Sequence, residues 1–200
     1  PGPFNVLVSP HEHVVENCIK DLTIHGDEFD MMGLSRTPYN KINIHLGVGA
    51  GDHDGAIARF VENFKLLSPN VQQRLTLEND DKARMFSVVD LMRVHEATGI
   101  PIVFDSHHHE LGPQDQGYKD AFYLARSTWP KGIRQQCHHS NSKKLYEDSK
   151  VPAISHSSWY YTPFENFGEE VDVVLECKQK EMALFKYIKD FQPEITRLAS

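Results

Sequence analysis

Strand-like segments and helical patterns alternate along this 200-residue chain, and that alternation constrains the fold more than any other feature. The strand-like segments are residues 40–47, 73–80, 100–107, 133–140 and 171–178. Apolar residues recur three and four positions apart in five helical patterns, residues 10–29, 54–67, 85–99, 119–129 and 178–192. Strands that alternate with helices predict parallel strands joined by right-handed crossovers. The sequence therefore predicts an α/β fold.

The predicted strands suit a sheet that is covered on both faces. IPIVF and VDVVLE are apolar at successive positions, as in a doubly covered sheet or a barrel wall. No linker or low-complexity stretch divides the chain, and 200 residues are enough for one filled domain. We expect a single domain over residues 1–200.

Each predicted strand ends in a histidine or a carboxylate: His45, Glu78, Asp105, His138 and Glu176. In a parallel barrel the carboxyl ends of the strands meet at one mouth, where such proteins place their chemistry. A lone histidine at a strand end is usually only hydrogen-bonded. Glu78 and Glu176, however, follow the apolar runs LTL and VVL, where an unpaired carboxylate is costly. The five residues together predict a mixed nitrogen and oxygen site for divalent transition metals.

The stretch FDSHHH supplies three consecutive histidines. His108 lies three residues after Asp105 and can return over the same mouth, whereas His107 and His109 are expected to point elsewhere or to support the ligands. His139 has the same ambiguity beside His138. His156, in the long connection over residues 140–170, is a further candidate, and spacing alone leaves it open between ligand and loop residue.

Composition narrows the function classes. The net charge of −7 disfavours non-specific attraction to nucleic acid. Carboxylates that bind metal ions are neutralised by them, however, so this charge does not exclude an enzyme that acts on nucleic acid. No apolar run approaches a membrane span, so no membrane partner is expected. Three widely spaced cysteines, Cys18, Cys137 and Cys177, indicate buried thiols in a reducing compartment. The chain has no GxSxG, P-loop, HExxH or CxxC motif.

Several segments stand in the order and spacing of one known family. They are NIHLG (43–47), LTLEND (75–80), VFDSHHH (103–109), CHHS (137–140) and VVLECKQKEMAL (173–184). With them, essentially the whole chain resembles the UV damage endonucleases. The resemblance implies a TIM (β/α)8-type barrel, similar to endonuclease IV, with a trinuclear metal centre. It also implies an enzyme of DNA repair that hydrolyses the phosphodiester bond 5′ to UV photoproducts and other lesions.

The resemblance also implies roles for the strand-end residues. Glu78 would bridge two metal ions, with His45 on the first of them. The second ion would be held by Asp105, His138 and Glu176, and the third by His108 and His156. Glu78, Asp105 and Glu176 are the expected catalytic carboxylates. Mn²⁺ is the expected metal, in as many as three copies, and the same ligands would also accept Zn²⁺ or Co²⁺.

Damaged double-stranded DNA is the partner that the resemblance implies. Phe4 stands at the family's aromatic lesion probe. Trp159 and Tyr160 could line the DNA groove or simply pack the loop, and Lys143 and Lys144 could meet phosphates or water. The expected location is the cytoplasm, with the nucleoid, for a bacterial or phage protein, and the nucleus for a eukaryotic one.

The chain departs from the family pattern in its length and at two positions. A (β/α)8 barrel needs about 250 residues, and only the last five strand–helix units are visible here. We therefore expect a partial barrel whose partner is a missing N-terminal segment, with an exposed sheet edge. Gln136 stands where relatives carry a lysine near the metals, and Pro3 stands where they usually carry glutamine.

Two alternatives stay open at this point. Metal-dependent sugar isomerases and epimerases also place glutamate, aspartate and histidine at barrel strand ends, around one or two metals. The chain could also be an inactive fragment that needs an N-terminal partner. A count of three metals per site would favour the nuclease, and one or two would favour the isomerase.

Overall fold

The computed structural model describes residues 6–47, 51–113 and 115–192. Its five strands form one parallel sheet in the order β1-β2-β3-β4-β5, so each strand pairs with its neighbours in the chain. The strands are β1 Ile42–His45, β2 Leu75–Glu78, β3 Ile102–Asp105, β4 Gln136–His139 and β5 Asp172–Leu175. Each of them lies inside one of the strand-like segments, which confirms the predicted order of elements.

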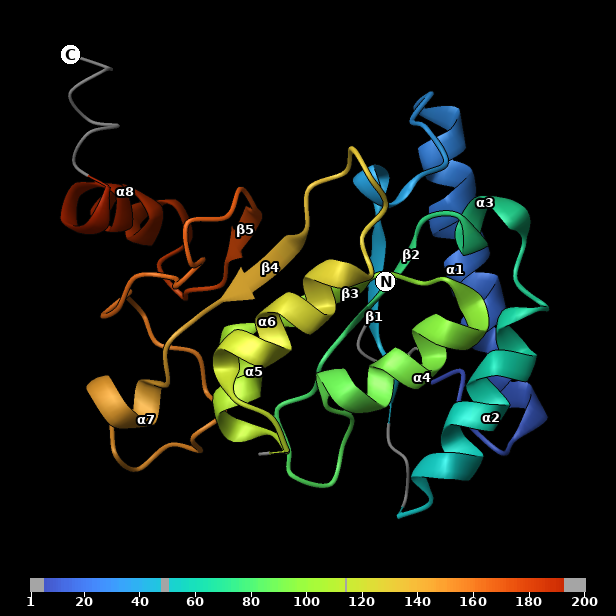
Figure 1. Cartoon of the computed structure of the whole chain (residues 1–200), viewed down its shortest axis with the longest axis horizontal. Coiled ribbons are helices and arrows are strands. Elements are labelled where there is room, and N and C mark those ends of the chain that lie inside the picture. The colour runs from blue at the N-terminus through green and yellow to red at the C-terminus, as the bar shows by residue number, and fades with distance from the viewer. Residues whose placement is uncertain (1–5, 48–50, 114, 193–200) are drawn as a thin grey trace.

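The long helices cover one face of this sheet. Figure 1 shows α1, α2, α4 and α6 following one another around the strands, with α8 beyond β5. Their bounds are α1 Glu12–Met31, α2 His53–Phe64, α4 Val88–Thr98, α6 Tyr118–Ser127 and α8 Lys180–Phe191. These helices match the five helical patterns of the sequence. Ser87 and Asp90 form a capping box at the start of α4, and Gly99 ends this helix with φ 77°, a left-handed value that favours glycine.

The two faces of the sheet differ in polarity. Apolar side chains such as Leu77 and Phe104 are fully buried against helix residues that include Phe60 and Phe122. Burial of this apolar surface is the main force that holds helices to strands. Because side chains alternate along a strand, the other face carries Asn43, Thr76 and Glu78. The Thr76 hydroxyl donates to Asn43 Oδ1 (2.9 Å), and the Asn43 amide donates to Glu78 Oε2 (2.6 Å), which forms a polar row that leads to the strand ends.

Consecutive parallel strands with helices on the outer face form the wall of a (β/α)8-type barrel. The predicted fold class is therefore confirmed, with five strand–helix units in the described part of the chain. Within the described residues, β1 and β5 each pair with a single neighbour. Val174 in β5 is 41% exposed, in contrast to the fully buried β2 and β3.

A buried arginine, Arg74, links several segments at the end of the sheet where β2 begins. The Arg74 side chain, just before β2, is fully buried and forms an ion pair with Asp30 (2.9 Å). Its guanidinium donates to four backbone carbonyls, those of Gly26, Leu34, Ser35 and Asn70. A single side chain thus joins the end of α1, the following turn and the short helix α3, Pro69–Gln72.

The sequence patterns did not predict the shortest helices. These are α3, α5 Ser106–Leu111, α7 Lys143–Tyr146 and the 3-10 turn Pro38–Asn40. Elements of this length are too short to show a helical period. The three cysteines are buried and unbridged, as predicted. In the described parts of the chain, no helix is both long enough and apolar enough to span a bilayer.

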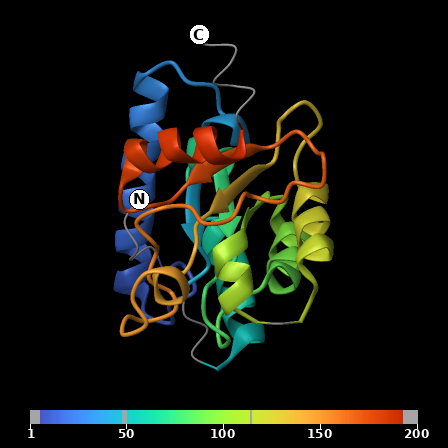
Figure 2. The same cartoon turned by 90° about the vertical axis from the view of Figure 1, so that its left-hand side faces the viewer.

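A second, smaller apolar cluster lies beside β5. It consists of Tyr160, Cys177, Ala183 and Tyr187, with Trp159 packed against it. Figure 2, seen from the side of β5, shows α8 in red and the short helix α7 in orange in front of the sheet. This cluster holds α8 and the end of the 140–170 connection together next to the last strand.

Candidate metal centre

The parallel register brings the predicted strand-end residues together. His45 of β1 lies opposite Glu78 of β2, and Asp105 of β3 lies opposite His138 of β4. Glu176 follows β5 directly, where its amide still donates to the His139 carbonyl (2.9 Å). All five residues therefore lie at the carboxyl ends of the strands, which is the end where barrel proteins place their active sites.

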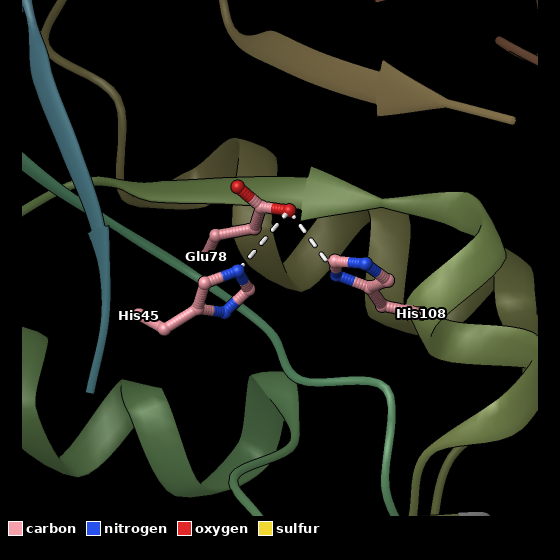
Figure 3. A group of neighbouring side chains, drawn as sticks. All are labelled: His45, Glu78 and His108. Atoms are coloured by element: carbon pink, nitrogen blue, oxygen red, sulfur yellow. Dashed lines mark ion pairs between the residues drawn. The ribbon is translucent and has the colours of Figure 1, made fainter. Parts of the chain in front are cut away.

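Glu78 lies at the middle of the cluster. One of its oxygens, Oε1, is 3.1 Å from His108 Nδ1 and 3.8 Å from His45 Nε2. The other, Oε2, is 3.2 Å from His138 Nδ1. Figure 3 shows the His45 and His108 rings turned toward the same carboxylate oxygen. Glu78 is 4% exposed, so it meets its partners in a nearly dry environment.

Asp105 and His108 are placed by the start of α5. The Asp105 side chain caps this helix by accepting a hydrogen bond from the His108 amide (2.8 Å). Its other oxygen lies 3.7 Å from His108 Nδ1. His108 Nδ1 also lies 3.0 Å from the Asn79 carbonyl, which orients the ring. The histidine run is thus helical rather than a loop, and its middle member, His108, turns Nδ1 toward the carboxylates of Glu78 and Asp105.

His138, Glu176 and His156 form the other half of the cluster. His138 Nδ1 is 3.2 Å from Glu176 Oε1 and equally close to Glu78. His156 Nδ1 lies 3.8 Å from Glu176 Oε2 and 3.1 Å from the Glu176 carbonyl oxygen. The rings of His108 and His156 face each other edge-on, with centroids 6.2 Å apart. The structure therefore gathers all seven predicted ligand residues around one mouth.

The connection that carries His156 is held in place along its length. Ser142 and His156 form an isolated antiparallel bridge, and the Lys143 amide donates to the Ser155 carbonyl (2.7 Å). Glu147 accepts hydrogen bonds from the Ser158 amide (2.6 Å) and the Ser158 hydroxyl (2.9 Å). These contacts fix the backbone on both sides of His156, although the segment has almost no regular structure.

Opposed charges hold the side chains of the cluster. Burial alone raises the pKa of Glu78, but the contacts with His108 and His138 outweigh it and hold this pKa well below its ordinary value. Burial lowers the pKa of both histidines, yet the facing carboxylates raise each to about 10. Burial raises the pKa of Asp105 to about 6. Carboxylates this deeply buried need compensating positive charge.

The donor set fits divalent metal ions. One group of ligand atoms, from His45, Glu78 and His108, lies within 4.8 Å of one another, and so does a second group from Glu78, Asp105 and His138. Asp105 Oδ2 and His138 Nδ1 are buried and have no hydrogen-bond partner in the described residues. Imidazole nitrogens and carboxylate oxygens in this combination suit Mn²⁺, Zn²⁺ and Co²⁺. Glu78 belongs to both groups and so has the position of a bridging ligand.

Other residues support this cluster, and of those named here the sequence analysis singled out only Gln136, through the resemblance to the family. The Asn79 amide donates to the Asp105 carbonyl (3.0 Å) and accepts from the Asp105 amide (2.8 Å), which locks β2 to β3 at their ends. Gln136 Nε2 lies 3.0 Å from His138 Nε2, on the ring edge away from the carboxylates. An added Cβ on Gly112 would collide with the backbone oxygens of Asp80 and His108. Supporting residues of this kind have no periodic signature in a sequence.

Asp80 faces the ring nitrogen of His45 that points away from Glu78. Its Oδ1 lies 3.0 Å from His45 Nδ1, close but not aligned as a hydrogen bond in this conformation, while His45 Nε2 faces Glu78. A carboxylate behind a histidine orients the ring and strengthens it as a metal ligand. We expect Asp80→Asn to weaken Mn²⁺ binding by about 10- to 100-fold, measured by isothermal titration calorimetry. Asp81→Asn, which removes the next carboxylate of the same run, is the matched control and should leave the affinity unchanged.

The neighbouring histidines have other roles. His139 is buried, with Nδ1 2.8 Å from the Ser106 hydroxyl and Nε2 3.0 Å from the Thr162 carbonyl. His109 packs near the Phe104 ring, with centroids 5.5 Å apart. His107 is fully buried, its ring lies 5.2 Å from that of His156, and burial lowers its pKa to about 4. The two groups of facing ligand atoms found in the described residues include neither His107 nor His109, and they also leave out the predicted ligands His156 and Glu176.

The predicted DNA-contacting residues differ in how exposed their side chains are. Tyr160 is 4% exposed and stacks on the His139 ring at 5.7 Å, so its side chain packs the loop and offers no surface to DNA in this structure. Trp159 is half-buried against the same cluster. Lys143 is half-buried and Lys144 exposed, both on α7. Phe4 and Pro3 lie outside the described residues.

A parallel α/β sheet that gathers histidines and carboxylates at its strand ends defines a barrel-type protein with a cluster suited to metal ions. The family model for UV-endonuclease UvdE matches residues 1–200. The chain therefore belongs to the UV-endonuclease UvdE family, as the sequence motifs predicted. The residues of the centre, such as His45, Glu78 and Asp105, lie in the sequence motifs that carry the resemblance to this family.

Individual relatives agree with this assignment. The UV DNA damage endonuclease of Bacillus velezensis is 33% identical over 201 residues, and the match covers 95% of this chain and 60% of the relative. That of Bacillus pumilus is also 33% identical, with the same coverage. The crystal structure of SacUVDE is 35% identical with a TM-score of 0.81, over 96% of this chain and 64% of that one. The chain thus spans about three-fifths of the length of these curated relatives.

A more distant structure shares the fold alone. The crystal structure of D-psicose 3-epimerase with D-tagatose, from Clostridium cellulolyticum H10, has a TM-score of 0.56 at 14% identity. It covers 88% of this chain and 62% of its own. This similarity supports the barrel architecture without bearing on chemistry.

Proposed function

We propose that this chain carries the catalytic metal centre of a DNA repair endonuclease that hydrolyses the phosphodiester bond 5′ to UV photoproducts. The observation that carries the proposal is the position of Glu78, whose two oxygens face two different groups of ligand atoms. A carboxylate shared in this way suits a multinuclear centre, which is a recurrent solution for phosphodiester hydrolysis. Membership of the UvdE family supports the same reaction.

Mn²⁺ is the metal we propose, in as many as three copies, with Zn²⁺ or Co²⁺ as substitutes. His45 and Glu78 would hold the first ion. Asp105, His138 and Glu176 would share the second with Glu78, and His108 and His156 would hold the third. When bound, such ions lower the pKa of water and stabilise the charge that develops on the attacking and leaving oxygens.

The protein residues supply position and charge. Glu78 and Asp105, buried at 4% and 0% exposure, present their oxygens in a site from which bulk water is largely excluded. Such a site strengthens every electrostatic contact with the phosphate. The Asn43 amide keeps the Glu78 carboxylate in place, and the Asn79 side chain holds the backbone of Asp105. The centre is therefore organised before DNA arrives.

Damaged double-stranded DNA is the proposed substrate. Extrusion of a nucleotide costs least where a lesion already disturbs stacking. Phe4 and Trp159 are the proposed aromatic contacts, and Lys143 and Lys144 the proposed phosphate contacts on α7. An enzyme with this substrate acts where the DNA is, in the cytoplasm of a bacterium or the nucleus of a eukaryote.

Metal-dependent sugar isomerisation is the competing chemistry on this fold. Histidines and carboxylates at barrel strand ends are compatible with this chemistry too, whereas the UvdE family model matches residues 1–200. The number of metals separates the two functions. We expect three equivalents of Mn²⁺ per chain by plasma mass spectrometry after equilibration, because Glu78 faces two ligand groups and His108 with His156 would hold a third ion. One or two equivalents would favour the isomerase.

Incision of UV-irradiated DNA tests the proposed function. The chain is incubated with Mn²⁺ and a duplex that carries one cyclobutane pyrimidine dimer, and the products are sized on a sequencing gel. A single cut on the 5′ side of the lesion is expected, with no cut in the undamaged duplex or in the presence of EDTA. The Glu176→Gln variant should not cut. Equal cutting by this variant, or no cutting by a chain that binds its metals, would contradict the proposal.

A further inference from the structure

A cavity opens beside the metal centre on the side of β5. It has a volume of about 350 Å³ and is lined by His156, Glu176, Cys177, Lys178 and Lys180. Two of these residues, His156 and Glu176, also belong to the metal centre. The cavity and the centre therefore share a wall, so a group bound in the cavity lies directly next to the proposed reaction site.

The charge of this cavity differs from that of the chain. The chain carries a net charge of −7, but the cavity is lined by two lysines and a single carboxylate. Lys178 and Lys180 are exposed, and no described acidic side chain forms an ion pair with either. Elsewhere, Arg93, Arg126 and Lys65 are paired with carboxylates. The cavity thus offers two unpaired cations beside a carboxylate-rich centre.

The backbone under the two lysines is firmly placed. The Lys178 amide donates to the Ser157 carbonyl (3.0 Å), and the Gln179 amide donates to the Ser158 carbonyl (3.2 Å). Lys180 has a φ of 46°, in the left-handed region where a side chain is strained and glycine is favoured. Strained residues of this kind gather at functional sites. Lys180 thus carries its amine from a strained backbone position at the wall of the cavity.

We propose that Lys178 and Lys180 form a subsite for a DNA backbone phosphate next to the phosphate that is hydrolysed. This inference rests on the proposed function, since it takes the metal centre as the place of the scissile phosphate. A strand that reaches the centre must lay its neighbouring phosphates along the walls of the mouth. Because an acidic chain repels DNA at long range, local cations have to supply the attraction.

Salt-dependent binding tests this subsite. The probe is a fluorescein-labelled duplex with one cyclobutane pyrimidine dimer, and Kd is measured by anisotropy at several KCl concentrations. The unmutated chain is the parent, with Ca²⁺ in place of Mn²⁺, and a gel checks that the duplex stays uncut. Lys178→Met and Lys180→Gly should each weaken binding several-fold and lower the slope of log Kd against log salt by about 1. Lys131→Met, at the opposite end of β4, removes the same charge and should leave the slope unchanged.

The choice of Lys180→Gly separates binding from folding. Glycine accepts the left-handed backbone, so the melting temperature of this variant should equal or exceed that of the parent. An unchanged slope in both lysine variants, an equal change in Lys131→Met, or failure of the parent chain to bind the duplex would overturn the subsite. Cleavage of the duplex by the unmutated chain with Mn²⁺, together with unchanged slopes in Ca²⁺, would reject the subsite alone. Changed slopes without any cleavage in Mn²⁺ would reject the proposed reaction alone.

Discussion

Replacement of Glu78 by glutamine is expected to remove metal binding and incision together. Glutamine has the same shape but lacks the charge, and Glu78 contributes to both groups of ligand atoms. We therefore expect Mn²⁺ affinity to fall by more than about 100-fold, beyond the loss typical of residues that only support ligands. Incision should fall by at least about 100-fold, the usual cost of losing one element of preorganised charge. Titration calorimetry and the gel assay measure the two effects separately.

Glu96→Gln is the matched control for this change. Glu96 is an exposed carboxylate on α4, on the helical layer rather than at the strand ends. The same chemical change there should leave metal binding and incision as they are. The bridging role of Glu78 would be contradicted if Glu78→Gln retained the full complement of Mn²⁺, even if it had lost activity.

Arg74→Met is expected to give the largest loss of stability. The methionine fills similar space, but Asp30 loses one of its cationic partners and four carbonyls lose a donor. Asp30 is 27% exposed and keeps Arg36, so the main loss comes from the buried carbonyls. Each buried carbonyl left without a donor costs about 1–3 kcal/mol, a large part of the free energy of unfolding of an ordinary domain. Urea denaturation followed by circular dichroism measures the change.

The exposed pair of Arg93 and Asp54 provides the comparison. Its atoms are 2.8 Å apart, closer than those of Arg74 and Asp30, but the side chains are 48% and 84% exposed. Arg93→Met should therefore change the free energy of unfolding by less than about 1 kcal/mol. Equal losses in the two variants would show that burial and the carbonyl contacts of Arg74 contribute nothing beyond the ion pair itself.

The sequence predicted β2, β3 and β5 because each holds a short apolar run that ends at or beside a carboxylate. It predicted β1 and β4, which are more polar, because a histidine recurs in them about one strand–helix unit away from those carboxylates. Once the strands are parallel and in chain order, the register brings residues such as Glu78 and Asp105 to one mouth without further information. That step needed no knowledge of side-chain packing. It is the reason why the candidate ligands could be selected from a single sequence.

The supporting residues could not be predicted in the same way. Asp80 and Asn79 act through specific contacts with His45 and Asp105, and such contacts depend on distances that a pattern does not contain. Tyr160 was an open choice between DNA contact and packing, and burial against His139 decides it for this structure. Lys178 and Lys180 follow β5, and a charged pair after a strand gives no sign in the sequence that a cavity adjoins it.

Helix α5 has a consequence for how this family can vary. It begins at Ser106, directly after Asp105, which both caps it and faces the metal centre, and His108 follows within the first turn. Each residue of a helix is turned by about 100° from the one before. One residue inserted or deleted between Asp105 and His108 would swing the ligand out of the mouth and carry a neighbouring histidine toward it. The number of residues in this short interval should therefore tolerate change far less than the identity of the histidines on either side of His108.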